Sequence, residues 1–345
     1  MKLALLVPGP FGTISGGYIY DRRIVEGLRG LGHDVRVVEL AGRHPLPDAT
    51  AEEAARAALA ALPDDVLPVI DGLGLPAFAP LAEDLVRRRA VGLIHHPTAL
   101  EHGAPAEDRA ALRSIERDLF PRLARLVATS PHTAGRLTAD FAVPAERIGI
   151  VEPGTDPAPR AEGSGGPGVV ILAVGTLVPR KGHDVLLRTL AGLPDLDWKL
   201  IIAGGARDTV HAHGLRALAE ELTIGQRVRF AGELSAEALE AEYRRADIFA
   251  LATWWEGYGM AAAEAMARGL PLAITAGGAI ADLVPMEAGA VSPPGDTVSL
   301  TKALRRMIVD TEMLREMAEA SWAAGQALPR WSDRASAFAA ELERA

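Results

Sequence analysis

The sequence contains no cysteine among its 345 residues. Disulfide bonds, thiolate metal sites and cysteine nucleophiles are therefore excluded. The chain also lacks an excess of basic residues, because its formal net charge at pH 7 is −9. This balance argues against nucleic acid as the main partner, since a phosphate backbone requires a basic face. A small phosphorylated ligand would need only two or three local cations and is compatible with this charge.

Long apolar runs are also missing. No uninterrupted run is long enough to span a bilayer, so we expect no integral membrane segment. The N-terminal stretch "MKLALLVPGPFG" is interrupted by Pro8 and Gly9, which makes it too short for the core of a signal peptide. It reads better as a first buried strand of a cytoplasmic protein. No clean basic amphipathic helix is present, but peripheral membrane contact stays an open alternative.

Two halves of the chain begin with the same order of elements. "LALLVP" is a continuous apolar run typical of a strand buried on both faces; a glycine-rich loop, a helical pattern and the strand "DVRVVEL" follow. The same order recurs in "GVVILAVG", "TLVPRKG", "HDVLLRTLAGL" and "WKLIIAGG". Each unit spans roughly thirty residues, the usual length of a βαβ unit. Further strands are predicted at "VLPVID", "VGLIHH", "RLVATS", "VRFAGE", "DIFALAT" and "PLAITA".

A proline- and glycine-rich stretch at residues 152–168 reads as a linker between the halves. We therefore predict an α/β protein with two doubly wound, Rossmann-like domains that face each other across a cleft. The first domain is expected at 1–157, together with a C-terminal helix at about 328–345 that packs back on it. The second is expected at 166–327. Ligands should lie at the carboxyl ends of the strands.

The stretch "WWEGYGMAAAEAMARG" places one glutamate on a glycine-flanked loop and another on the following helix. The first-turn amides of that helix are unpaired donors suited to phosphate or a sugar hydroxyl. Glu264 could accept hydrogen bonds from a diol such as ribose, and Glu256 from a second group of the same ligand. Alternatively, Glu264 pairs with Arg268 at i+4 and Glu256 is solvated. The spacing alone does not decide between these interpretations.

Cations and histidines follow other predicted strands. Arg180 and Lys181, in the loop "TLVPRKG", could bind a diphosphate, although a solvated pair is the commoner role of such a dipeptide. His95 and His96 end a strand, and one of them could donate to a substrate oxygen; a structural histidine is the alternative. His102 is close in sequence, but the spacing matches no metal-ligand pattern.

Two motifs are misleading. "DLD" at Asp195–Asp197 matches an Asp-x-Asp metal motif, but it lies in a predicted turn before a strand, at the wrong edge of the sheet for ligands. The first βαβ unit resembles a dinucleotide fold, yet the spacing of Gly9, Gly12, Gly16 and Gly17 does not give G-x-G-x-x-G. A dehydrogenase is therefore disfavoured.

The segment "EGYGMAAAEAMARG" resembles the E-x7-E signature of retaining glycosyltransferase family 4, whose two-domain fold is called GT-B. "GTLVPRKG", "VEPGTD" and "SGGYIYDRRIVEGLRGLGHDV" resemble that family in the same order, so the likeness spans nearly the whole chain. It implies transfer of a sugar from a nucleotide diphosphate sugar to an acceptor hydroxyl. It also implies a metal-independent reaction that needs no cofactor besides the donor.

The resemblance also implies roles for individual residues. Glu264 would hold the donor ribose, Glu256 the hydroxyls of the transferred sugar, and Lys181 with Arg180 the leaving diphosphate. His95 would contact the donor sugar, with His96 as the fallback. Close approach or backbone contact to the ligand would come from glycines and from the start of the glutamate helix: Gly17, Gly175, Tyr258, Gly259 and Met260.

One position departs from the family pattern. Thr176 stands where the family often has an arginine, so either Arg180 supplies that charge or the leaving-group site is weaker. A nucleotide-sugar epimerase and a non-catalytic sugar-nucleotide binding protein are the alternative functions. The acceptor and the donor base cannot be read from the sequence.

Overall fold

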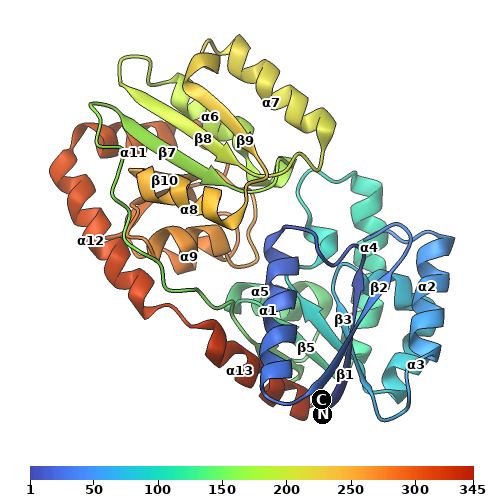
Figure 1. Cartoon of the computed structure of the whole chain (residues 1–345). Helices are drawn as coiled ribbons and strands as arrows, with labels where there is room; N and C mark the ends of the chain where they lie inside the picture. Colours follow the sequence, from blue (N-terminus) through green and yellow to red (C-terminus); the bar gives the residue numbers. More distant parts are fainter. The chain divides into compact units, whose positions relative to one another are not determined.

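The computed structural model describes all 345 residues and divides the chain into two units. The first unit comprises Met1–Gly154 and Pro329–Ala345, and the second comprises Thr155–Leu328 (Figure 1). Each unit contains one six-stranded sheet whose paired strands are all parallel. The predicted class, two doubly wound α/β domains, is confirmed.

The first sheet is ordered β2-β1-β3-β4-β5-β6. Its central strands are buried on both faces, since helices cover both sides of a doubly wound sheet. In β1, for example, every residue after Lys2 is buried. The strands are β1 (Lys2–Pro8), β2 (Asp34–Leu40), β3 (Leu67–Asp71), β4 (Val91–Ile94), β5 (Arg125–Ala128) and β6 (Ile148–Ile150).

Capping residues define the ends of several helices around this sheet. Ser130, for instance, accepts a hydrogen bond from the backbone N–H of Thr133 at 3.0 Å, and Pro131 occupies the first helical position of α5. The helices are α1 (Gly16–Gly30), α2 (Ala49–Ala60), α3 (Ala82–Arg87), α4 (Ala106–Leu119) and α5 (Pro131–Phe141).

The second sheet is ordered β12-β11-β10-β7-β8-β9. The sequence analysis identified its strands except β12, and those of the first sheet except β6. Both missed strands are short and lie at a sheet edge, so neither forms a long apolar run. The strands are β7 (Val169–Val174), β8 (Trp198–Ala203), β9 (Val228–Gly232), β10 (Ile248–Leu251), β11 (Leu272–Thr275) and β12 (Gly289–Ser292).

Seven helices accompany the second sheet. Its apolar core includes Trp198 and Phe249, which are almost completely buried. No helix of the chain combines the length and the apolar character needed to cross a bilayer. The helices are α6 (His183–Ala191), α7 (Thr209–Glu221), α8 (Ala236–Arg245), α9 (Met260–Met266), α10 (Ile280–Leu283), α11 (Thr297–Val309) and α12 (Thr311–Ala327).

The C-terminal helix α13 (Trp331–Glu343) belongs to the first unit, as the sequence analysis expected. It packs against α1 (Figure 1). The contact is close, because a Cβ added at Gly27 of α1 would lie 2.5 Å from the Cβ of Ala335. Glu341 of the same helix pairs with Arg125 of β5, which fastens α13 to the sheet.

Candidate functional site

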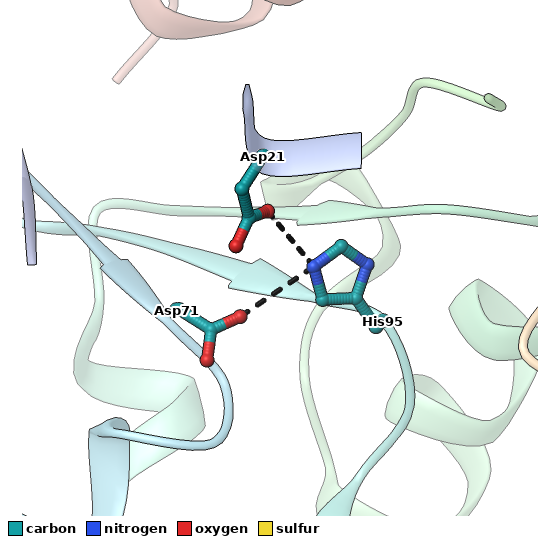
Figure 2. A group of neighbouring side chains, drawn as sticks. All are labelled: Asp21, Asp71 and His95. Atoms are coloured by element: carbon teal, nitrogen blue, oxygen red, sulfur yellow. Dashed lines mark hydrogen bonds and ion pairs between the residues drawn. The ribbon is translucent and has the colours of Figure 1, made fainter. Parts of the chain in front are cut away.

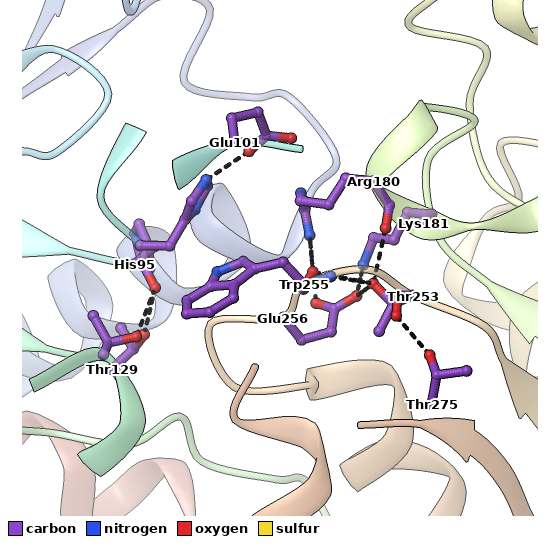
Figure 3. Close-up of polar contacts among 11 residues, drawn as sticks. His95, Glu101, Thr129, Arg180, Lys181, Thr253, Trp255, Glu256 and Thr275 are labelled. Carbon is purple, nitrogen blue, oxygen red and sulfur yellow. Dashed lines mark hydrogen bonds and ion pairs between the residues drawn. The ribbon is translucent and has the colours of Figure 1, made fainter. Parts of the chain in front are cut away.

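Lys181 and Glu256 form a largely buried ion pair in the second unit. The Lys181 Nζ lies 2.6 Å from Glu256 Oε1, and Arg180 Nη1 lies 3.7 Å from Glu256 Oε2 (Figure 3). Burial by itself would raise the pKa of Glu256, but the charges of Lys181 and Arg180 outweigh it and hold that pKa below its usual value. Glu256 is therefore an ionised carboxylate, and the alternative of a solvated loop residue is wrong.

Both partners follow strands that are neighbours in the sheet. Lys181 comes from the loop after β7, and Glu256 from the loop after β10. The residue after Lys181 must be a glycine. The φ of Gly182 is +62°, and an added Cβ would lie 1.9 Å from the carbonyl oxygen of Ala252. Gly175, at the end of β7, would place a Cβ 3.2 Å from the Cδ and Cε of Lys181. These glycines let the lysine side chain lie across the carboxyl end of the sheet.

A chain of buried hydroxyl groups supports the glutamate loop. The Thr275 hydroxyl donates to the carbonyl oxygen of Thr253 at 2.5 Å, and the Thr253 hydroxyl lies 3.3 Å from Glu256 Oε1 (Figure 3). The backbone of Glu256 is also bound, since its N–H donates to Gly277 and its carbonyl accepts from Ala279. The loop is therefore fixed on two sides, and the carboxylate is held in place before any ligand binds.

Glu264, the second glutamate of the motif, lies on α9 and is partly buried. Its Oε2 accepts a hydrogen bond of 2.9 Å from the hydroxyl of Tyr243 on α8. Burial raises the pKa of Glu264 above its usual value, while the Tyr243 hydroxyl and the charge of Arg268 act in the opposite direction.

The expected alternative, an ion pair between Glu264 and Arg268, does not form. Arg268 donates to the backbone carbonyl of Glu264 at 2.8 Å, and its guanidinium pairs with the side chain of Glu240. The guanidinium carbon also lies 4.4 Å from the ring centroid of Tyr243. Arg268 thus fixes the tyrosine ring, and the tyrosine hydroxyl fixes the glutamate.

Gly259 is the residue before the first turn of α9 and has φ +107°, a conformation that other residues rarely adopt. Tyr258 before it is buried, and Met260 is the first residue of the helix. The three residues therefore lie where the motif predicted, between the two glutamates. The sharp turn at Gly259 separates the loop of Glu256 from the helix of Glu264.

His95, in the first unit, is held by two buried carboxylates. Its Nε2 lies 2.9 Å from Asp21 Oδ1 on α1 and 3.5 Å from Asp71 Oδ2 at the end of β3 (Figure 2). Burial would lower the pKa of His95, but the Asp21 carboxylate and then Asp71 raise it above its usual value. Burial and the charge of Asp21 raise the pKa of Asp71 to about 7.

Gly17 lies against the same imidazole. A Cβ added there would be 3.2 Å from His95 Cδ2 and 3.4 Å from His95 Nε2. The family resemblance predicts that this glycine allows the ligand to approach closely; in this structure the group that comes close is the histidine ring. The fallback histidine, His96, is bound differently, because its Nε2 lies 2.6 Å from Glu101 Oε2.

Several residues of these clusters were not identified from the sequence: Asp21, Asp71, Tyr243, Thr253 and Thr275. One signal was available for Asp71. It ends the strand "VLPVID", just as His95 follows the strand "VGLI", and β3 and β4 are adjacent and parallel, with Asp71 beside Leu93. The Asp-x-Asp motif has the structural role expected of it: Asp195 lies in a turn and receives two hydrogen bonds of 2.7 Å from Arg305.

The second unit, which contains the ion pair and both glutamates, matches a known family. Residues 156–322, nearly the whole second unit, match the family described as "Glycosyl transferases group 1". The second unit is therefore similar to the group 1 glycosyltransferases. Lys181, Glu256 and Glu264 all lie within the matched region.

Curated relatives of this chain include a D-inositol 3-phosphate glycosyltransferase from Mycobacterium sp. (strain KMS). The two sequences are 34% identical over 212 residues, which is 56% of this chain and 48% of the relative. The chain therefore matches about half the length of that relative.

Solved structures of similar fold cover nearly the whole chain. Sucrose-phosphate synthase from Thermosynechococcus elongatus superimposes with a TM-score of 0.83 at 20% identity, over 99% of this chain and 98% of that one. HepE from Anabaena, in complex with UDP-glucose, gives a TM-score of 0.76 at 16% identity, over 99% and 100% of the two chains. These likenesses establish the fold.

Proposed function

We propose that this chain is a retaining glycosyltransferase that moves a sugar from a nucleotide diphosphate sugar to an acceptor hydroxyl. The observation that carries the proposal is the Lys181–Glu256 ion pair, with Arg180 beside it, at the carboxyl ends of β7 and β10. In open parallel sheets this edge is the one at which ligands bind. The family match of the second unit and the UDP-glucose complex of HepE support the same substrate class.

Lys181 and Arg180 would receive the negative charge of the leaving diphosphate. Together they place two positive charges beside the carboxylate of Glu256. Both side chains are mostly buried, where charges interact more strongly than in water. A group fixed in advance by its own contacts can stabilise the developing anion without reorganising during the reaction.

The glutamates would bind hydroxyl groups of the donor. Glu264 would accept from the ribose, and Glu256, ionised and fixed, from the sugar that is transferred. Neither would act as the acid or the nucleophile of a glycoside hydrolase. In the reaction, the bond between the sugar C1 and the phosphate oxygen breaks while a bond forms from the acceptor oxygen to C1 on the same face. The acceptor proton passes to the departing phosphate.

A thermal-shift screen with nucleotide diphosphates and their sugars tests donor binding first. The donor that raises the melting temperature most is then incubated with candidate acceptors, and NMR of the product reports the anomeric configuration. Retention is expected, and the rate should be the same after dialysis against EDTA, because protein cations replace a divalent ion. An inverted product, or a rate restored only by added metal, would contradict these parts of the proposal.

The same experiment separates the alternatives. An epimerase would change the donor in the absence of any acceptor, whereas a glycosyltransferase would leave it intact apart from slow hydrolysis. A binding protein would show the thermal shift without forming product. Products that form only when both donor and acceptor are present support the proposed transfer.

A further inference from the structure

Three titratable side chains of the first unit form one cluster, which no motif of the sequence contains. Asp21 comes from α1, Asp71 from the end of β3, and His95 follows β4 (Figure 2). Both carboxylates approach the same ring nitrogen, with Nε2 at 2.9 Å from Asp21 and at 3.5 Å from Asp71. The edge of the ring that carries Nε2 is therefore held by both carboxylates.

The opposite edge of the imidazole is the accessible one. Exposure is 1% for the Asp21 side chain, 5% for Asp71 and 22% for His95. Figure 2 shows Nδ1 on the side of the ring turned away from both carboxylates. Nδ1 makes no hydrogen bond within the protein and is not one of its fully buried unpaired polar atoms, so it can contact a ligand, whereas the carboxylates are shielded from one.

The ring is also fixed against rotation. Gly17 packs against Cδ2 and Nε2, and the ring of Tyr20 meets the imidazole edge-on, with centroids 5.2 Å apart. The Tyr20 hydroxyl donates to the carbonyl of Val151, and Asp71 Oδ1 accepts from the backbone N–H of Leu73. Since each neighbour is held by a separate contact, the imidazole has one defined orientation.

We propose that Asp21 and Asp71 are positioning residues that orient His95 and favour its doubly protonated form, so that Nδ1–H is presented as a charged hydrogen-bond donor to a sugar or phosphate oxygen of the substrate. The identity of that substrate rests on the proposed function. The orientation and the charge of His95 do not, because they follow from contacts within the first unit alone.

The electrostatics of the cluster agree with this arrangement. The titratable groups that face the imidazole are Asp21 from α1, Asp71 from β3 and Tyr20 from α1. The first two are acidic, whereas burial raises the pKa of the Tyr20 phenol and keeps it neutral. Two neighbouring carboxylates favour the imidazolium over the neutral ring, and they do so despite burial. An imidazolium N–H donates a stronger hydrogen bond to an oxygen with negative charge than a neutral one does.

A divalent cation is the competing occupant of this cluster. One ligand atom from each of the three residues lies within 4.8 Å of the others, and carboxylates with a histidine can hold a metal ion. However, Nε2 cannot donate a proton to Asp21 and coordinate a metal at the same time. The 2.9 Å separation between Nε2 and Asp21 Oδ1 fits a direct hydrogen bond, and the removal and addition of metal described below distinguish the two occupants.

The test combines NMR of the histidine rings with steady-state kinetics on the full chain. Nitrogen-15 spectra of histidine-labelled protein, assigned with His95→Gln, give the protonation state and the titration of His95 without any substrate. The variants are Asp21→Asn and Asp71→Asn, which keep side-chain volume and remove charge. Glu26→Gln is the matched control, since Glu26 is an exposed carboxylate on the same helix as Asp21.

In the wild-type protein we expect His95 to titrate above the usual histidine range. The pKa measured for His95 should fall in Asp21→Asn, fall less in Asp71→Asn, and stay unchanged in Glu26→Gln. In the transfer assay, kcat of Asp21→Asn should drop roughly tenfold. The complete loss of a hydrogen-bond donor to the reacting group costs about 100-fold, and this variant only weakens the His95 N–H donor. The pH profile of kcat should shift in the same direction as the NMR titration.

Two results would overturn the proposal. One is an unchanged titration of His95 in both Asn variants. The other is a change in the His95 spectrum when the protein is dialysed against EDTA or titrated with Zn²⁺, which would assign the cluster to a metal. If the NMR results are as expected but no donor is ever turned over, the proposed transfer fails while the orientation and charge of His95 stand. If Asp21→Asn does not fold, the fall in the His95 pKa in Asp71→Asn tests the proposal, and an unchanged pKa in that variant overturns it.

Discussion

Lys181 and Glu256 are 75 residues apart in the sequence, and their charged groups are 2.6 Å apart in the fold. The pair means that the lysine charge is held in place by the carboxylate that would bind the sugar. Both groups are largely buried, so the removal of either one leaves a buried charge with fewer partners. Stability and activity are therefore linked at this site, and a test must separate them.

Lys181→Met should reduce kcat/KM at least 100-fold, because the cation proposed to receive the leaving diphosphate is lost while the volume of the side chain is kept. The free energy of unfolding should also fall, by about 3 kcal/mol, since Glu256 keeps only the more distant Arg180. Steady-state kinetics and urea unfolding measure the two effects. Lys302→Ala is the control, because Lys302 is an exposed lysine on α11 of the same unit.

The double variant Lys181→Met, Glu256→Gln separates the two effects. Because it carries no unpaired carboxylate, its stability should return towards that of the wild-type protein while its activity stays low. Recovery of activity in the double variant would show that Lys181 acts only by neutralising Glu256. In that case the lysine has no role at the diphosphate.

Tyr243→Phe should weaken donor binding without a comparable loss of kcat. The substitution removes the hydroxyl that donates to Glu264 at 2.9 Å and leaves the ring packing with Arg268 and Phe249 intact. A hydrogen bond to a charged group contributes about 1.5–3 kcal/mol, so we expect the donor Kd to rise about tenfold, as measured by calorimetry.

Glu264→Ala should give a larger rise in the same Kd, because it removes the proposed ribose contact itself. Arg305→Ala, which removes only the exposed pair with Asp195, should leave it unchanged. If the donor Kd of Tyr243→Phe equals that of the wild-type protein, the Tyr243 hydroxyl does not position Glu264 for donor binding.

Gly17→Ala and Gly30→Ala form a matched pair on α1. A methyl group at residue 17 would lie 3.2 Å from His95 Cδ2, whereas at residue 30 it would meet nothing within 4 Å. We expect Gly17→Ala to displace the imidazole, which changes the NMR signals of His95 and reduces kcat about tenfold. Gly30→Ala should leave both unchanged. Equal spectra of the two variants would show that the ring has room to move.

Much of the fold could be predicted because strands buried on both faces are continuous apolar runs in the sequence. "LALLVP" and "DIFALAT" are strands for this reason, and each is followed by a loop at the ligand-binding edge of its sheet. The short edge strands β6 and β12 could not be found in this way. They are three and four residues long, and their pairing depends on the neighbouring strand more than on their own composition.

The candidate site was predictable only in part, because a local motif does not indicate which distant residues its side chains contact. "RKG" and the spacing of Glu256 and Glu264 identified cations and carboxylates, but no local pattern reveals that Lys181 binds Glu256. Asp21 lies within "SGGYIYDRRIVEGLRGLGHDV", where no local pattern identifies it as a buried residue, yet its side chain is 1% exposed. Only the packing of α1 on the sheet brings it to His95.

Glu116 should make the stability of the protein depend on pH. Its carboxylate is buried on α4 and accepts hydrogen bonds from the N–H and hydroxyl of Thr98 and from the N–H of Ala99. Burial outweighs these bonds and raises its pKa to about 7. The folded state therefore keeps a proton that the unfolded chain loses near pH 4.5. Stability contributed by this group falls as pH rises from about 4.5 to 7, by about 3 kcal/mol in total.

Glu116→Gln removes this titration and should be tested by urea unfolding at pH 5 and pH 8.5. At pH 5 the variant should be about 1 kcal/mol less stable than the wild-type protein, because the carboxamide N–H₂ cannot accept the bond from Ala99. At pH 8.5 the wild-type protein carries the cost of a buried charge and the variant does not, so the order should reverse. The same difference between the two proteins at both pH values would mean that Glu116 is already ionised in the folded state at pH 5. The three donors of the 98–100 turn would then outweigh burial.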